Sequence, residues 1–236
     1  AMDGRRLVEE QAAGQGYELV TLYWHEGDPS TRILELTEGM EIGADFPLPG
    51  ARRYGPQIVD LHYPLTDLEI SRYRWIGKKV NEILTGVARS LEPDVTERDV
   101  AARMLYEYAR AGMTIDVLIV GFDDRVWRYR HPMPTENGLE RYALLHVAAR
   151  RWGLHANVTR LVHFGKPPAE TKRAMDGVAT IGAHVRTLLA PGVRFADVLA
   201  EQRRLYAELG YDEEWTYHFQ GGITGYVLAD PARCLD

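Results

Sequence analysis

A short turn between two alternating runs of residues most constrains how this chain can fold. Tyr142–Val147 and Leu154–Val162 are rich in β-branched and apolar residues, which is typical of strands. Arg150–Gly153 lies between them and ends in a glycine, which favours a tight turn. The sequence therefore predicts an antiparallel hairpin. With the turn centred on its middle peptide bond, we expect His146 to lie directly opposite Asn157.

The second strand of this hairpin is expected to have one polar and one apolar face. Successive side chains on a strand point to opposite faces of the sheet. The polar face is then formed by His155, Asn157, Thr159 and His163, and the apolar face by Leu154, Ala156, Val158 and Val162. A coherent polar face either meets bulk water or lines a wet cleft.

Helical and strand patterns surround the hairpin. Thr66-Asp67-Leu68-Glu69 has the spacing of a capping box at a helix start. The predicted helices are Leu68–Leu91, Thr96–Ala111, Ala169–Leu189 and Phe195–Leu209, and the further predicted strands are Ile115–Val120, Val126–Arg130 and a glycine-interrupted pair over Trp215–Leu228.

The first part of the chain has a different pattern of short elements. We expect helices over Arg5–Gln15 and Thr31–Glu38, and strands over Tyr17–Tyr23, Glu41–Ala44 and Gln57–Leu61. This α/β fragment is small for an independent domain. We therefore place a domain boundary between residues 63 and 64, and assign the whole chain to the α+β class.

Composition narrows the possible functions. The formal net charge of -6 disfavours nucleic-acid binding. One cysteine, Cys234, can form neither an internal disulfide nor a multi-cysteine zinc site. No apolar run is long enough to span a bilayer, and the start lacks the pattern of a signal peptide. We expect a cytoplasmic protein that binds neither membranes nor nucleic acid.

A series of motifs after Pro64 resembles one family of enzymes. In order, the motifs are His131-Pro132, His146, Asn157-Val158-Thr159-Arg160, His218-Phe219-Gln220-Gly221-Gly222-Ile223-Thr224-Gly225-Tyr226 and Asp230-Pro231. Their order and spacing resemble the pita-bread family, which contains methionine aminopeptidase, aminopeptidase P, prolidase and creatinase. The resemblance implies a pita-bread domain over residues 64–236 that ends before its last strands. It also implies that residues 1–63 are part of a prolidase-like N-terminal domain.

The resemblance implies that the metal ligands of this family have been replaced. Metal-dependent members hold two divalent ions with two aspartates eleven positions apart, a histidine and two glutamates. Here the aspartate positions correspond to His146 and Asn157, the histidine to Gly222 and the first glutamate to Asp230, and the second glutamate would follow Asp236. Two adjacent dications need bridging anionic oxygens. We therefore expect neither a metal nor another cofactor.

Two histidines match positions that do not bind metal in this family. His131 and His218 correspond to histidines that contact substrate or transfer protons, and creatinase hydrolyses a C–N bond without metal through a histidine at the position of His131. The resemblance thus implies acid/base catalysis by His131 and orientation of the substrate by His218. The residues expected to bind substrate are His146, Asn157, Thr159 and Asp230.

Two functions follow from this resemblance. The chain is either a metal-independent hydrolase of an amide or amidine in a small molecule or peptide, or an inactive pseudo-peptidase that binds a peptide or protein partner. A structural, hydrogen-bonded role for each histidine also fits the sequence. Prolidase-like relatives imply a homodimer in either case.

Overall fold

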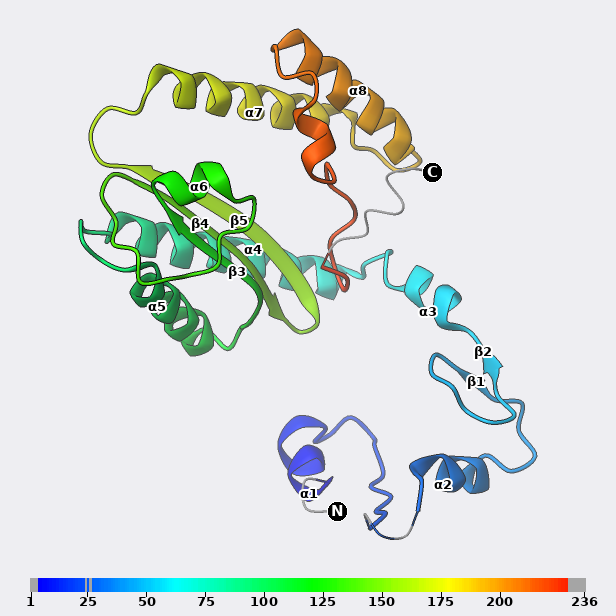
Figure 1. Cartoon of the computed structure of the whole chain (residues 1–236). Coiled ribbons are helices and arrows are strands. Elements are labelled where there is room, and N and C mark those ends of the chain that lie inside the picture. The colour runs from blue at the N-terminus through cyan, green and yellow to red at the C-terminus, as the bar shows by residue number, and fades with distance from the viewer. Residues whose placement is uncertain (1–3, 24, 26, 229–236) are drawn as a thin grey trace. The chain divides into compact units, whose positions relative to one another are not determined.

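The computed structural model describes residues 4–23, 25 and 27–228. The chain divides into two compact units, residues 1–61 and 62–236 (Figure 1). None of the described helices has the length and apolar character needed to cross a membrane. That the first unit belongs to a prolidase-like N-terminal domain stays a prediction.

The first unit consists of short elements. They are α1 (Gly4–Arg6), the π-helical turn η1 (Leu7–Gln11), α2 (Pro29–Leu36), β1 (Gly43–Ala44), β2 (Arg52–Arg53) and α3 (Gly55–Leu61). The predicted helix over Thr31–Glu38 is confirmed as α2, which begins earlier because the Asp28 side chain accepts a hydrogen bond from the Ser30 amide. The two short strands pair in parallel.

Two predicted strands in this unit are wrong. Tyr17–Tyr23 is not a strand, because no described segment pairs with it and a strand needs a partner for its backbone groups. Gln57–Leu61 belongs to the helix α3 instead. Pro56 in its first turn removes a backbone donor that a helix start does not use. Short apolar runs do not by themselves distinguish a strand from a helix.

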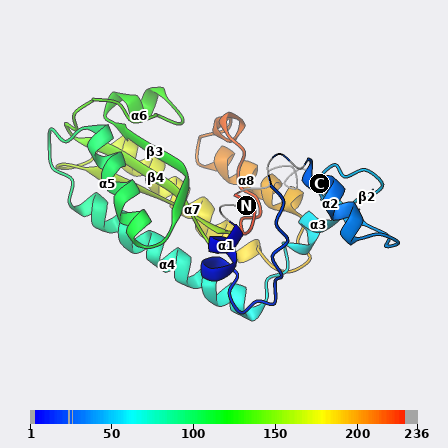
Figure 2. The same ribbon diagram turned by 90° about the horizontal axis from the view of Figure 1, so that it is seen from below.

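A three-stranded antiparallel sheet forms the core of the second unit. Its strands lie in the order β3 (Thr114–Phe122), β4 (Tyr142–Arg151) and β5 (Leu154–His163). Two helices, α4 (Asp67–Arg89) and α5 (Glu97–Arg110), cover one face of this sheet (Figures 1 and 2). Both helices begin with a capping box, Thr66 with Glu69 and Thr96 with Asp99.

The helix α4 buries one stripe of side chains against the sheet. Its fully buried residues include Ile76, Val80, Leu84 and Val87, at the spacing of one helical face. The apolar face predicted for β5 is confirmed, since its four residues belong to or pack on this core. The opposite, polar face of β5 does not pack against these helices.

The hairpin forms as predicted, but with a different register. His146 pairs with Thr159 and Asn157 pairs with Ala148, so the predicted pairing of His146 with Asn157 is wrong. The two-residue turn consists of Trp152 and Gly153, both with positive φ (52° and 79°), as in a type I′ turn. The centre of the turn thus lies one residue later than predicted. Because this displaces the partner by two residues, all side chains keep their face.

The remaining elements are mostly helical. The helices α7 (Ala169–Leu188) and α8 (Phe195–Glu208) pack on each other and are followed by the 3₁₀ turn η2 (Glu214–Tyr217). Two further strand predictions are wrong: Val126–Arg130 lies largely in the helix α6 (Asp124–Arg128), and Trp215–Leu228 forms no strand pair. Glycines interrupt the pattern of this last segment. It contacts β5 through isolated backbone hydrogen bonds, such as the one that the His155 amide donates to the Gly225 carbonyl.

Candidate functional site

One partly buried histidine lies on the polar face of the hairpin's first strand. His146 lies in the middle strand, between Ile119 of β3 and Thr159 of β5. Its Nδ1 is 2.9 Å from the Thr159 hydroxyl oxygen. The hydroxyl therefore restrains the imidazole ring, and two of the predicted substrate-binding residues are in direct contact.

The two histidines predicted to be catalytic meet each other. The rings of His131 and His218 are 5.2 Å apart between centroids and nearly perpendicular, at 88°. His131 follows α6 and is exposed, whereas His218 follows η2 and is half-buried. Segments far apart in the sequence thus bring together the pair that the motifs single out.

The electrostatics of His146 link it to this pair. Burial lowers the pKa of His146, and the nearby imidazoles of His131 and His218 lower it further. Each of these effects disfavours a positive charge on the ring. His146 is therefore held neutral near pH 7.

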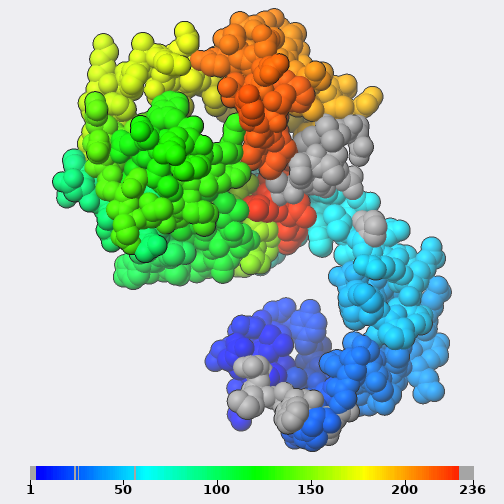
Figure 3. All heavy atoms as spheres, in the orientation of Figure 1, coloured from blue at the N-terminus to red at the C-terminus, as the bar shows by residue number. Residues whose placement is uncertain are grey.

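The position of His218 is fixed by its own segment. Its Nδ1 lies 2.7 Å from the Phe219 carbonyl oxygen, and its ring contacts the Phe219 ring at 4.3 Å between centroids, tilted by 33°. The Gln220 side chain donates to the His218 carbonyl, and Gln202 of α8 donates to the Gln220 carbonyl. Figure 3 shows this segment in orange-red, continuing from α8 along the surface of the unit. Sequence reasoning missed Phe219, although an aromatic residue beside a motif histidine is a usable signal.

The structure shows no contact between the histidines described above and the other predicted site residues that it describes. Asn157 lies on the same face as His146, is exposed, and its side chain is 3.5 Å from the Leu228 carbonyl oxygen. Asp230 lies outside the described residues. His155, on the same face, is buried and bonds Asp116 and the Gly225 carbonyl. Its role is structural, because it joins β5 to the segment around Gly225.

The residues present do not fit the paired metal ions of the family. Among the residues that the structure describes, no group of three or more His, Cys, Asp or Glu side chains could hold a metal ion. His146 and Asn157 offer a neutral nitrogen and an amide where two carboxylates would be needed, and Gly222 offers no side chain. A metal-free site stays a prediction.

The sequence model of metallopeptidase family M24 matches residues 71–231, more than half of the chain. The chain belongs to this family. A curated relative, an uncharacterized peptidase of Staphylococcus saprophyticus, is 23% identical over 161 residues, which are 67% of this chain and 46% of that protein. The chain thus spans less than half the length of this relative.

Solved structures of prolidases and dipeptidases share the fold. Dipeptidase PepE from Mycobacterium ulcerans has a TM-score of 0.75 and 19% identity, covering 97% of this chain and 66% of that one. The Xaa-Pro dipeptidase from Bacillus anthracis has a TM-score of 0.75 and 18% identity, covering 95% and 68%. The prolidase from Pyrococcus horikoshii has a TM-score of 0.72 and 18% identity, covering 84% and 62%. The expected α+β pita-bread fold is therefore confirmed.

Proposed function

We propose that this M24 chain hydrolyses a C–N bond, in an amide or amidine of a small molecule or short peptide, by histidine acid/base catalysis without a metal pair. The observation that carries this proposal is the contact between the His131 and His218 rings, both of which lower the pKa of His146. Imidazole is the side chain best suited to move protons near neutral pH.

His131 is the proposed acid and base. It takes a proton from a water molecule as the water oxygen attacks the carbonyl or amidine carbon. The C–N bond then breaks, and the proton on His131 passes to the leaving nitrogen. The exposure of His131 supports this role, because a substrate and water can both reach its ring.

His218 is proposed to orient the substrate. With Nδ1 donating to the Phe219 carbonyl, a neutral ring has its Nε2 free to accept a hydrogen bond. It can therefore bind an N–H group of the substrate. The neutral His146, with Thr159, Asn157 and Asp230, is proposed to bind the remaining polar groups.

A substrate panel with a chelator tests this proposal. Xaa-Pro dipeptides, other small amides and amidines are incubated with protein in excess EDTA, and released amine is measured. We expect turnover with at least one class, and a loss of roughly 10²–10⁴-fold in His131→Ala. The melting temperature should hardly change. His184→Ala is the control, because this histidine of α7 pairs with Glu201 of α8 and is not one of the proposed site residues.

Two results would contradict the metal-free reaction. One is stoichiometric zinc, manganese or iron in the purified protein together with loss of turnover in EDTA. The other is a His131→Ala protein that keeps full turnover.

The expected homodimer is a separate part of the proposal, and sedimentation of the purified chain tests it.

The exposed apolar side chains beside the histidines favour a second candidate, an inactive peptide-binding protein. Met133, Tyr217 and Phe219 are all exposed large side chains close in sequence to His131 or His218. They offer a surface for a peptide or protein partner. In that case no substrate turns over, and a bound peptide protects the hairpin between His146 and His163 from hydrogen exchange.

A further inference from the structure

A charged side chain outside the histidine cluster is completely buried. Glu97, at the first position of α5, has 0% of its surface exposed. The sequence pattern offers no sign of this, because an acidic residue in the first turn of a helix is commonly solvent-exposed and favoured by the helix dipole. A buried carboxylate needs partners for both of its oxygens, so the partners of Glu97 indicate what it holds.

Four hydrogen bonds occupy the two oxygens of Glu97. Oε1 accepts from the Phe122 amide at 2.9 Å and from Nε of Arg125 at 3.0 Å. Oε2 accepts from the Thr135 amide at 2.8 Å and from the Thr135 hydroxyl at 2.6 Å. One side chain therefore binds both ends of the segment 122–135, and His131 lies on that segment.

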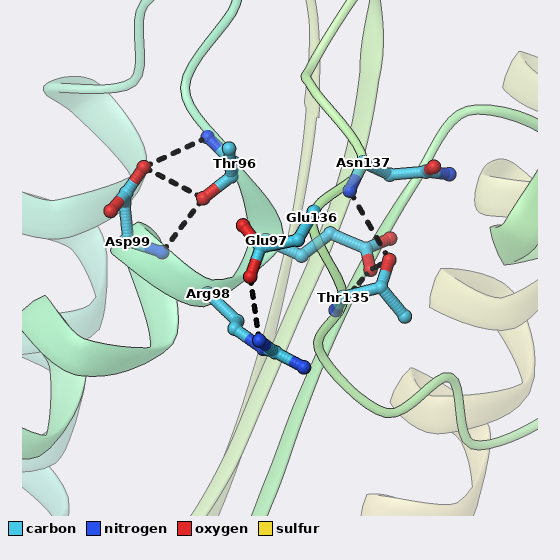
Figure 4. Close-up of polar contacts among 7 residues, drawn as sticks. All are labelled: Thr96, Glu97, Arg98, Asp99, Thr135, Glu136 and Asn137. Carbon is cyan, nitrogen blue, oxygen red and sulfur yellow. Dashed lines mark hydrogen bonds and ion pairs between the residues drawn. The ribbon is translucent and has the colours of Figure 1, made fainter.

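Two further sets of contacts fix the same segment. Arg125, held by Glu97, also donates from Nη2 to the Met133 carbonyl at 2.7 Å, two residues after His131. At the start of α5, the amides of Glu97 and Arg98 donate to the carbonyls of Asn137 and Thr135. Figure 4 shows Glu97, at the start of α5, beside the stretch from Thr135 to Asn137. The helix end and the segment are therefore joined through both backbone and side chains.

We infer that Glu97 is a positioning residue for the proposed reaction: its buried carboxylate closes the segment 122–135 so that His131 meets His218. This inference rests on the proposed function, since it gives His131 its catalytic role. Glu97 touches neither histidine. It acts through Phe122, Arg125 and Thr135, which together determine where the segment begins, how it is braced and where it ends.

Glu97→Gln is the direct test. Only one end of the glutamine amide group can accept, so in either orientation its Nε2 faces a backbone N–H, that of Thr135 or that of Phe122, donor against donor. Glu136→Gln is the matched control. Glu136 is an exposed carboxylate beside Thr135, and its 2.6 Å ion pair with Arg98 lies on the surface at the same helix end.

The readout is the contact between the two histidine rings, which needs no substrate. In ¹⁵N-labelled protein, ring protons of His131 and His218 are close enough for a nuclear Overhauser cross-peak. We expect Glu97→Gln to lose this cross-peak and Glu136→Gln to keep it. Turnover should fall about a hundredfold in Glu97→Gln, the loss that a displacement of ~1 Å can cause.

Each outcome decides the inference. A folded Glu97→Gln protein with an unchanged cross-peak overturns it, whatever the turnover. Should Glu97→Gln fail to fold, Thr135→Val decides instead, because it keeps the carboxylate and removes the hydroxyl bond to Oε2, together with the longer bond of 3.3 Å from the Asn137 amide to the same hydroxyl. A weaker cross-peak in Thr135→Val supports the inference, and an unchanged one overturns it. A lost cross-peak in Glu97→Gln together with full turnover in His131→Ala would support the positioning of the segment and refute the proposed function instead.

Discussion

His131 and His218 meet edge to face, with 5.2 Å between their ring centroids, although one follows α6 and the other follows η2. His146 lies close enough for both rings to act on its protonation. The site therefore depends on how the segments that carry His131 and His218 are held near the sheet strand that carries His146, and the following predictions test those supports.

The stability of the protein should fall as the pH is lowered through the ordinary range of histidine. The pKa of His146 is lowered by burial and then by His131 and His218, so the unfolded chain takes up a proton at a higher pH than the folded one. The unfolded state is thereby favoured below the ordinary pKa of 6.5. Thermal melts between pH 8 and 5 measure this effect. His146→Gln, which cannot titrate, should have a flatter profile, and an equally steep one would show that other groups are responsible.

Gly121→Ala should displace the segment that carries His131. A Cβ at Gly121 would lie 2.9 Å from Cβ of Pro132 and closer still to its Cγ, so the buried proline must move. We expect a loss of about 1–3 kcal/mol in unfolding free energy and loss of the cross-peak between the His131 and His218 rings. The measurements are denaturant unfolding and the NMR experiment described above.

The control for this variant is Gly86→Ala. Gly86 lies in α4, and a Cβ there meets nothing within 4 Å. Alanine should stabilise the helix by about 0.5–1 kcal/mol and leave the ring contact intact. A Gly121→Ala protein as stable as this control would refute the packing argument.

The start of α4 should weaken in acid because of Glu69. The pKa of this carboxyl is lowered from 4.5 to about 2, chiefly by the hydrogen bond from Tyr226 and then by those from Thr66. A lowered pKa means that the stabilisation is present above pH 4.5 and is lost as the pH falls toward 2. Unfolding of wild type and Glu69→Gln at pH 7 and at pH 2.5 should show a difference in stability that shrinks in acid. A constant difference would rule out ionisation of Glu69 as its cause.

The hairpin turn should tolerate no side chain at its second position. Gly153 has φ of 79°, and a Cβ there would lie 2.9 Å from the Tyr226 ring. Gly165→Ala is the matched control, because its φ of 86° is similar but nothing lies within 4 Å of an added Cβ. The control should lose about 1–2 kcal/mol from backbone strain, and Gly153→Ala should lose more. Equal losses in denaturant unfolding would show that Tyr226 simply moves away.

The sequence predicts those parts of the second unit that depend on local patterns. The capping box at Thr66, the amphipathic α4 and the polar face of β5 all follow from spacings within a few residues, and all are confirmed. The predicted register of the hairpin is wrong because Trp152 has a positive φ. A bulky residue rarely adopts this conformation, so the sequence does not point to Trp152 as a turn residue.

The contacts that build the site are not local; the family motifs single out His131 and His218, but not the contacts between these residues. No spacing indicates that the ring of His218 meets His131, or that Glu97 binds the amides of Phe122 and Thr135. Such contacts depend on how helices and loops pack on the sheet. For the same reason, the segment after Trp215 could not be distinguished from a strand pair by its glycines and apolar residues alone.

The two-residue loop Trp152–Gly153 joins strands whose side chains alternate between the two faces of the sheet, and this alternation limits how the loop can change in length. Adding or removing two residues at this point would slide β5 along its neighbour but leave Asn157 and Thr159 beside His146 on the same side. Adding a single residue would turn the strand over, drive those polar groups against α4 and expose Ala156 and Val158 to water. Natural variants of this loop should therefore differ in length by even numbers of residues, unless a bulge in β5 compensates.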